Sequence, residues 1–273
     1  MEPLNIDELT NIPVIDLDKV YLRAVELDDY PDMYDYGKND EVTKTLMWNS
    51  YQHIEDAKNA CLNVFLARPK RGMPSAHAII DKITKKMIGT CDFAYIDWAN
   101  SSGEIGYVIH PDYWGQGIMT SVCAKVVEFG FQYLGLKTIV IGHYLNNIGS
   151  KRVILKNGFT YTHTKEAKNG HEPIPMYKIG RNDIIVRRAT IDDSVGKGTC
   201  HYQSWIETYT GLIEQEYLDN RSVEKCIALA YQFPMNTFVA TKAGKVLGFS
   251  AYNTSRDEDL NNYGEIRAIY VLK

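Results

Sequence analysis

The sequence predicts an α/β fold with a mixed (α+β) sheet, built as two related domains in tandem. Strand-like segments joined by short turns and followed by a strand, a helix and a strand are typical of a mixed sheet. Three short patterns also recur in the same order at an offset of roughly 160 residues, which is near the size of a whole domain. The recurring pairs are residues 21–25 with 186–190, 86–89 with 245–248, and 103–105 with 264–266.

The first domain, residues 1–180, is predicted to place hairpin strands before a helical crossover. Its longest helix is indicated by apolar residues at helical spacing, since Ile118, Val122 and Val126 form one row and Met119 starts the row beside it. In chain order we expect a strand at 20–24, helices at 28–36 and 54–67, strands at 76–81, 87–95 and 104–109, a helix at 118–134, a strand at 138–143, a helix at 150–156, and strands at 159–164 and 176–179. The polar segment 178–183 is the predicted linker.

The second domain, residues 181–273, repeats the opening of the first. We expect a strand at 184–189, helices within 191–209 and at 222–231, and strands at 237–241, 246–252 and 266–271. The glycine-rich turn of the first domain does not recur, so the sequence predicts the amino-terminal half of a second domain. An incomplete sheet exposes a strand edge and apolar surface. We therefore expect the first domain or another chain, as in a homo-oligomer, to cover it.

A glycine-paired turn between a strand and a helix is the most informative local feature. Gly115 and Gly117 lack a Cβ, which permits a tight turn and close approach of a ligand to the backbone. The first turn of the following helix has amides without intrahelical partners and carries partial positive charge, so it favours an anion such as phosphate. The alternative is that the two glycines serve only the turn.

Composition excludes several classes of function. The 273 residues carry 30 Lys and Arg against 34 Asp and Glu, a net charge of −4, so no basic surplus favours nucleic acid or an anionic membrane. We expect no membrane partner, because no apolar run is long enough to span a bilayer and the amino terminus does not look like a signal peptide. The 5 cysteines lack metal-ligand or disulfide spacing, so we expect no metal and a cytoplasmic location.

Several motifs occur in a fixed order along the first domain. They are Glu104-Ile105-Gly106-Tyr107, then residues 111–117, Asn147-Ile148-Gly149-Ser150, and Lys156-Asn157-Gly158-Phe159. Together they resemble the GNAT superfamily of acyl-CoA-dependent N-acetyltransferases, in particular the branch of RimJ/RimL-type ribosomal-protein N-acetyltransferases. The resemblance implies the GNAT fold and acetyl-CoA as co-substrate.

The resemblance also implies where acetyl-CoA binds. Its pyrophosphate is expected on the amides that follow the glycine turn, and its pantetheine on the preceding strand and on Asn147. The expected cofactor-binding residues are Val108, Ile109, His110, Trp114, Gly115, Gln116, Gly117, Ile118, Met119, Thr120, Asn147 and Ser150. The large side chain of Met119 departs from the family pattern. It either crowds the phosphates or, on its apolar helical row, packs into the core.

Three residues are candidates for proton transfer, which acyl transfer to an amine requires. Glu104 is expected either to take the amine proton or to make a structural ion pair. Ser150 is expected either to give a proton to the departing thiolate or to cap its helix. Tyr144 is the other candidate acid, or lines the pocket. Aromatic residues that could bound the acceptor site are Trp48, His53, Tyr95, Trp98 and Tyr107.

The second domain resembles a different GNAT branch through the residues 204–209, 211–213, 217–219 and 256–258, with Glu265 in the place of Glu104. Only the first domain has a full acetyl-CoA pattern, so we expect one active site. The predicted function is transfer of an acetyl group to the primary amine of a protein N-terminus or a small molecule. The alternatives are a non-catalytic CoA-binding or interaction module and an aminoglycoside-type acetyltransferase.

Overall fold

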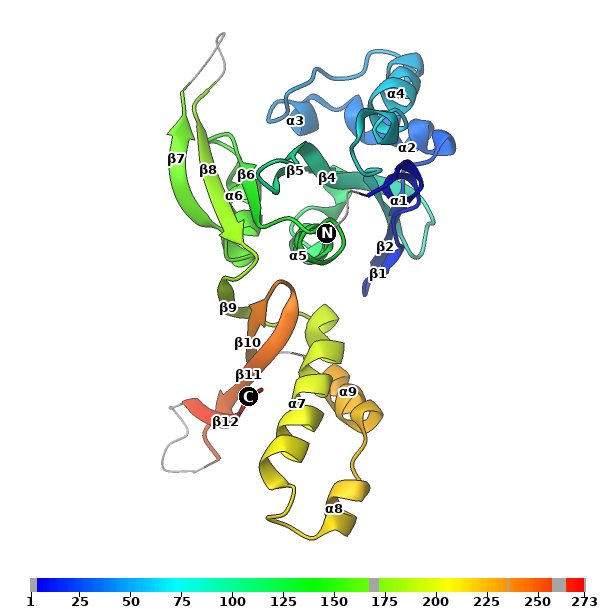
Figure 1. The fold of residues 1–273 in the computed structure, drawn as a ribbon. Helices are drawn as coiled ribbons and strands as arrows, with labels where there is room; N and C mark the ends of the chain where they lie inside the picture. Colours follow the sequence, from blue (N-terminus) through cyan, green and yellow to red (C-terminus); the bar gives the residue numbers. More distant parts are fainter. Residues whose placement is uncertain (1–3, 167–171, 235, 257–263, 273) are drawn as a thin grey trace. The chain divides into compact units, whose positions relative to one another are not determined.

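The computed structural model describes residues 4–166, 172–234, 236–256 and 264–272. The predicted motif at 256–258 therefore falls mostly outside the described residues. The chain divides into two compact units, Met1–Arg181 and Asn182–Lys273 (Figure 1). Each is described by itself. No helix among the described residues is long and apolar enough to cross a membrane.

Unit 1 contains a mixed sheet of eight strands in the order β1-β2-β3-β4-β5-β6-β8-β7. Neighbouring strands are antiparallel except β5 and β6, which are parallel. This arrangement confirms the predicted α/β fold with a mixed sheet. The strands are β1 (Ile15–Asp16), β2 (Val20–Ala24), β3 (His77–Asp81), β4 (Met87–Asp97), β5 (Ser102–Ile109), β6 (Thr138–Gly142), β7 (Thr160–Lys165) and β8 (Ile174–Gly180).

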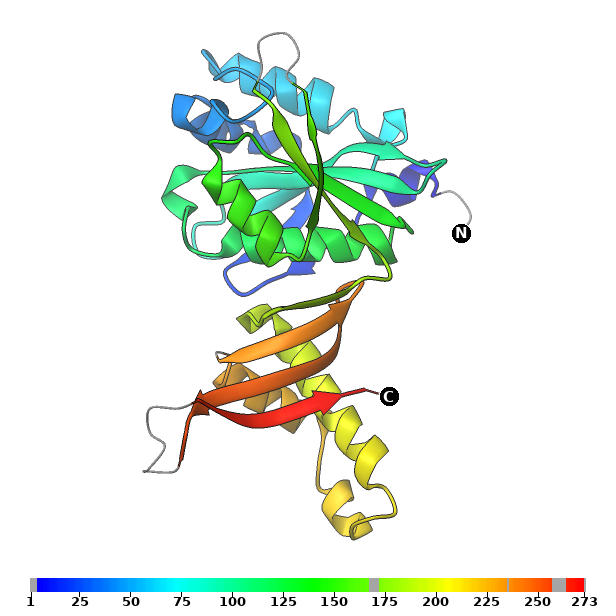
Figure 2. The same cartoon turned by 90° about the vertical axis from the view of Figure 1, so that its left-hand side faces the viewer.

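Helices cover both faces of this sheet (Figures 1 and 2). On one face, Met33 and Tyr36 from the first helices pack with Ala78 and Val108 of the strands in a buried cluster. On the other face lie the two later helices. In chain order the helices are α1 (Ile6–Thr10), α2 (Tyr30–Gly37), α3 (Asp40–Thr43), α4 (Ile54–Ala60), α5 (Ile118–Gln132) and α6 (Ile148–Lys156).

Strands β5 and β6 pair over a short stretch only. The parallel register joins Ser102 to Thr138, Gly103 to Ile139 and Glu104 to Val140, and β5 continues for five further residues to Ile109 without β6. On its other side β5 stays paired with β4 up to Ile109, with an irregularity in β4 opposite Glu104. The carboxyl-terminal half of β5 therefore has one unpaired edge, which is the structural opening on which the site is built.

The buried His77 should make stability depend on pH. Its ring is 1% exposed, meets Phe129 edge to face at 4.8 Å, and leaves Nε2 without a hydrogen bond within the described chain. Burial lowers the pKa of His77 from 6.5 to about 4. His77 therefore binds a proton less readily in the folded state than in the unfolded state. The contribution of neutral His77 to the free energy of unfolding is complete above pH 6.5 and is lost as the pH falls towards 4. The loss from pH 7.5 to 4.5 should be about 2.5 kcal/mol.

This prediction is checked by urea unfolding at several pH values. The free energy of unfolding of His77→Leu should fall less steeply between pH 7.5 and 4.5 than that of the natural chain. His163→Leu is the matched control, because His163 lies on β7 and is exposed. Identical pH slopes for the natural chain and His77→Leu would show that the neutral imidazole is not what the core requires.

Unit 2 is a four-stranded antiparallel sheet in the order β12-β11-β10-β9, with two longer helices on one face (Figures 1 and 2). A Cβ at Gly198 of α7 would lie 2.4 Å from the Cα of Ile227 in α9, so only glycine lets these helices approach so closely. The elements are β9 (Ile184–Arg188), α7 (Ser194–Tyr209), α8 (Gln215–Asp219), α9 (Val223–Gln232), β10 (Thr237–Lys242), β11 (Lys245–Thr254) and β12 (Gly264–Val271).

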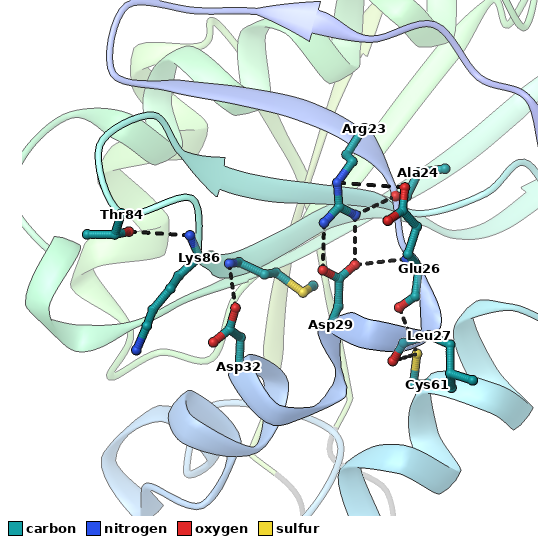
Figure 3. Close-up of polar contacts among 10 residues, drawn as sticks. Arg23, Ala24, Glu26, Leu27, Asp29, Asp32, Cys61, Thr84 and Lys86 are labelled. Carbon is teal, nitrogen blue, oxygen red and sulfur yellow. Dashed lines mark hydrogen bonds and ion pairs between the residues drawn. The ribbon is translucent and has the colours of Figure 1, made fainter.

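An equivalent arginine-aspartate pair joins β2 of unit 1 and β9 of unit 2 to the turn that follows each strand. Arg23 donates to both carboxylate oxygens of Asp29 at 2.8 and 2.7 Å, and Asp29 also accepts from the Glu26 amide at 2.8 Å (Figure 3). In unit 2, Arg187 makes the same two bonds to Asp193, both at 2.8 Å. Burial alone would raise the pKa of Asp193, but the hydrogen bonds and charge of Arg187 hold it below its usual value. The structure therefore shifts the first of the three sequence echoes by one residue, because Arg187, and not Arg188, is the equivalent of Arg23.

Removing one member of this pair should be costly. Asp29→Ala leaves the Arg23 guanidinium, whose side chain is 21% exposed, without its partner. We expect a loss of about 3 kcal/mol in the free energy of unfolding, since breaking a largely buried ion pair strands the other charge. Guanidinium unfolding followed by tryptophan fluorescence in a Trp205→Phe background reports unit 1. Asp28→Ala, at the exposed neighbouring position, should cost less than 0.5 kcal/mol. Equal losses in the free energy of unfolding for the two variants would show that the Arg23–Asp29 ion pair does not account for the effect.

The long predicted helices and strands match the structure closely, while several short elements differ. The structure contains four short elements that no sequence pattern indicates, α1, β1, α3 and α8, each of five residues or fewer. The predicted helix at 54–67 is α4 followed by a π-helical segment, Cys61–Phe65. The predicted linker at 178–183 is too long, because β8 continues through Gly180 and β9 begins at Ile184. Pairing with β6 keeps residues 178–180 in the sheet.

Candidate active site

A cavity of about 520 Å³ lies in unit 1 where β5 loses its partner. It is bounded by the end of β5, the glycine turn and start of α5, the start of α6, and the segment around α3. Its size is within the range of small-molecule sites. Ten of the predicted site residues line it, namely Val108, Ile109, Trp114, Gly115, Gly117, Ile118, Met119, Thr120, Asn147 and Ser150.

The glycine turn has the backbone geometry of an anion site. Gly115 and Gly117 adopt φ of +74° and +79°, a left-handed conformation that other residues avoid, and a Cβ at either would meet nothing within 4 Å. The first amide to bond back into the turn is that of Thr120, to the Gly117 carbonyl. In the described structure the amides of residues 115–119 donate to no backbone or side-chain acceptor. Open space and free donors together suit a phosphate.

Trp114 fixes the turn to the end of β5. Its indole Nε1 donates to the Ile109 carbonyl at 2.9 Å. Next to it, the His110 amide donates to Ile88 of β4 at 2.7 Å. Because hydrogen-bonding direction alternates along an antiparallel pair, the peptide groups of Ile109 and Tyr107 face the unpaired edge. Within the predicted stretch from Val108 to His110, Ile109 thus presents its peptide to the unpaired edge, while the His110 amide is bonded to β4.

Ser150 lies at the centre of a hydrogen-bonded chain on the cavity wall. Its hydroxyl is 2.9 Å from the Tyr107 hydroxyl, and its amide donates to the Asn147 side-chain oxygen, also at 2.9 Å. Asn147 in turn donates from Nδ2 to the Thr45 hydroxyl at 3.0 Å. Asn147, and not Ser150, therefore caps α6. The Ser150 hydroxyl remains available for chemistry.

Tyr107 had been predicted to bound the acceptor site, and its partnership with Ser150 was not foreseen. Burial raises the pKa of the Tyr107 phenol well above its usual value of 10. The hydroxyl therefore stays protonated and can donate to Ser150 when Ser150 loses its own proton. The strand and the helix that carry the two residues are brought together by packing of α6 beside the open edge of β5.

Met119 and Ile118 belong to the core of the first helical turn. They are 7% and 6% exposed. Met119 therefore packs largely inward, as its apolar row predicts, and leaves the amides clear. The Gln116 side chain turns back to donate to the Asp112 carbonyl at 2.8 Å, so only its amide faces the turn.

Two cations on the cavity rim escaped the sequence analysis. Arg152 and Lys156 stand four residues apart on α6, are exposed, and line the cavity. Neither makes an ion pair with any residue in the described part of the chain. Their spacing places both side chains on one face of a helix, but it indicates a role at the site only when α6 is known to lie beside the glycine turn. Asn157 fixes that placement by donating to the Thr120 carbonyl at 3.2 Å.

The other two candidate proton-transfer residues do not line the cavity. Glu104 lies on the same face of β5 as Val108, four residues away, and so faces the side covered by α2 to α4. Its carboxylate is 3.4 Å from the Lys165 Nζ, and its side chain is 35% exposed. Tyr144 is 9% exposed and its hydroxyl contacts the Met47 sulfur at 3.5 Å. Met47 itself is 76% exposed. The proton-transfer roles of Glu104 and Tyr144 therefore remain predictions.

The aromatic residues that were predicted to bound the acceptor site do not lie together. Tyr107 lines the main cavity, whereas Tyr95 and Trp98 line a separate cavity of about 380 Å³ beside Arg68. Trp48 stacks on Tyr51 at 4.9 Å. His53 caps α4. Sequence composition could not distinguish these roles, because aromatic residues serve packing as readily as binding.

The site as a whole can hold an anionic, extended ligand and support a proton transfer. Free amides and two cations suit phosphate groups, the open edge of β5 suits an amide-bearing chain, and the Ser150 hydroxyl stands between them. A Cβ-free turn with open space above it fits the pyrophosphate-bearing ligand that the motifs imply. No cluster of three or more His, Cys, Asp or Glu able to hold a metal occurs among the described residues.

The known proteins that this chain resembles are acetyltransferases. The family model described as "Acetyltransferase (GNAT) domain" matches residues 19–160. The N-acetyltransferase YoaA of Bacillus subtilis is 34% identical over 149 residues, which are 54% of this chain and 82% of YoaA. The ribosomal-protein-serine acetyltransferase of Escherichia coli is 26% identical over 116 residues, 42% of this chain and 64% of that protein.

Solved structures show the same fold. RimL, the ribosomal L7/L12 alpha-N-protein acetyltransferase in complex with coenzyme A, superimposes with a TM-score of 0.56 at 24% identity, covering 62% of this chain and 98% of RimL. The microcin C7 self-immunity acetyltransferase MccE, in complex with acetyl-CoA and AMP, gives a TM-score of 0.53 at 23% identity, covering 60% of this chain and 93% of MccE.

Proposed function

Because this chain belongs to the GNAT acetyltransferase family, and therefore acts as an N-acetyltransferase, we propose that unit 1 holds its single active site and that the acceptor is the α-amine of a protein or peptide. The observation that carries the site is the glycine turn with its free amides facing the Ser150 hydroxyl across one cavity. The family match at residues 19–160 lies wholly within unit 1. Relatives named as ribosomal-protein acetyltransferases support the acceptor class.

Acetyl-CoA supplies an activated acetyl thioester when bound. The amides of residues 116–119 would hold its pyrophosphate, with Arg152 and Lys156 adding positive charge at the rim. The Ile109 amide on the open edge of β5 and the Asn147 side chain would hold the pantetheine. These groups are fixed by the turn, the strand and the helix cap, so binding needs little rearrangement.

Three residues would move protons. The Ser150 hydroxyl would give its proton to the sulfur as the thioester bond breaks, and the Tyr107 hydroxyl, 2.9 Å away, would replace it. Glu104, on the face covered by α2 to α4, would take the proton of the attacking amine. The side chains of Glu104 and of Lys165 on β7 are 35% and 49% exposed. Their ion pair can therefore open at a small cost in free energy.

The proposal is tested by measuring thiol release from acetyl-CoA with a panel of amines. Peptides with a free Ser or Ala amino terminus should be acetylated there, as located by mass spectrometry, and the same peptides with a blocked terminus but a free lysine should react much more slowly. Turnover of aminoglycosides alone would favour the small-molecule alternative. Binding of acetyl-CoA without turnover of any amine would favour the non-catalytic module.

A further inference from the structure

Unit 2 contains a cavity of its own, of about 590 Å³, between α7, α9 and the strands β10 to β12. Figures 1 and 2 show the two helices on one face of this sheet. The volume matches that of sites for small organic molecules. The cavity belongs to the part of the chain that lies outside the residues matched by the acetyltransferase family.

One wall of this cavity is aromatic. Tyr270 and Phe249, from neighbouring strands, lie with their ring centroids 5.2 Å apart. The His201 ring of α7 lies 4.5 Å from the Tyr270 ring and 6.1 Å from the Phe249 ring. The planes of these three rings are inclined to one another by 35°, 50° and 85°, so two layers contribute one continuous aromatic wall with several facets. A planar apolar group would bury against it favourably.

The charged side chains that line the cavity among the described residues are cationic. They are Lys197, Arg256 and Arg267, and no Asp or Glu of residues 172–234, 236–256 and 264–272 lines it. Lys197 is 3% exposed, and the one bond its ammonium makes within the described residues is to the Phe233 carbonyl at 3.1 Å. An ammonium has three donors, so two are left for a ligand. Burial lowers the pKa of Lys197, which an anion beside it would oppose.

Arg267 has donors to spare as well. Its Nη2 donates to the Thr254 carbonyl at 2.8 Å. Its Nε is 3.3 Å from a Glu265 oxygen, yet this buried nitrogen makes no aligned hydrogen bond in the described structure. Glu265 also accepts from the Arg256 amide at 3.0 Å. The nearest carboxylate is thus shared between two donors, and Asp193, which faces Lys197, is bound to Arg187.

We propose that this cavity of unit 2 is a second ligand site, which takes a small organic anion with a flat apolar body. The aromatic wall holds the body, and Lys197 with Arg267 holds the anionic group. Lys197 is buried, and among the described residues no carboxylate bonds its ammonium, which is unfavourable unless a ligand supplies the counter-charge. Arg267 has Glu265 beside it but keeps donors free for the same ligand. A carboxylate on a planar ring system supplies both features. The site is separate from the acetyl-transfer site of unit 1 and does not depend on it.

The experiment uses the full chain with saturating CoA, which occupies the unit 1 site, and the probe 2-naphthoate. Binding is followed through the indole N–H resonance of Trp205, assigned with Trp205→Phe, because this group lies 3.2 Å from the Tyr270 hydroxyl. We expect saturable binding below millimolar concentration. The neutral isostere 2-naphthylmethanol should bind at least tenfold more weakly. Equal affinity for the two probes, or no shift of the Trp205 resonance, would overturn the proposal without any variant.

Two variants test which cationic side chains hold the anionic group of the ligand. Lys197→Met and Arg267→Gln should each weaken 2-naphthoate binding at least tenfold while leaving 2-naphthylmethanol binding within twofold of the natural chain, which shows that the cavity is intact. Lys242→Met is the matched control, because Lys242 is exposed on β10 and is not among the lining residues. Unchanged naphthoate affinity in both cavity variants would contradict the proposed role of these cations.

Discussion

Gly117→Asp should weaken acetyl-CoA binding about 100-fold, or roughly 2.7 kcal/mol. The substitution places a carboxylate at the first turn of α5, where the free amides of residues 116–119 face the cavity. A negative charge there competes for those amides and repels the pyrophosphate. The fold should tolerate the change, because aspartate accepts a left-handed backbone better than most residues and is a favoured helix cap. Isothermal titration with acetyl-CoA measures the effect.

Gly211→Asp is a closely matched control. Gly211 has the same φ of +79°, and a Cβ there also meets nothing within 4 Å, but it lies in unit 2. Any cost of the left-handed backbone is therefore common to both variants. Acetyl-CoA affinity in Gly211→Asp should equal that of the natural chain. If both variants bound acetyl-CoA normally, the pyrophosphate site would be wrongly assigned.

Ser150→Ala should lower kcat about 100-fold and leave the affinity for acetyl-CoA within about threefold. General acids contribute this much or more to group transfer. The helix should keep its start, because Asn147 caps α6 through the Ser150 amide, which alanine retains. Single-turnover acetylation of a reactive peptide separates chemistry from binding. A full retention of kcat would show that the Ser150 hydroxyl only packs against Tyr107.

Tyr107→Phe tests whether the two hydroxyls act together. The ring and its packing stay, and the 2.9 Å bond to Ser150 is lost. We expect a loss of about tenfold in kcat. Because the second hydroxyl can act only through the first, Ser150→Ala combined with Tyr107→Phe should be no slower than Ser150→Ala alone. Independent, multiplicative losses would show that Tyr107 contacts the reacting atoms by another route.

The sequence predicted the elements that rest on local chemistry. Apolar residues at helical spacing placed α5 within two residues of its observed end. The glycine pair predicted a tight turn, which the structure forms with left-handed φ at Gly115 and Gly117. The sequence echo of residues 21–25 in 186–190 indicated related domains, but only the structure shows that Arg23 and Arg187 make equivalent bonds. Short helices such as α3 and α8 were missed, because a helix of five residues depends on tertiary contacts more than on its own propensity.

By itself, then, the sequence determined the glycine turn and the order of the longer strands and helices, since these depend on backbone preferences and apolar spacing. The order of its motifs indicated the family by resemblance. Only the tertiary structure decided which side chains share the cavity. Ser150 meets Tyr107 across 43 residues, and Arg152 and Lys156 reach the rim, because β6 leaves β5 after Glu104 and α6 packs beside the open edge. It also turned Tyr144 towards Met47 and gave unit 2 its cationic cavity. Such contacts are set by strand register and helix packing, which no local pattern records.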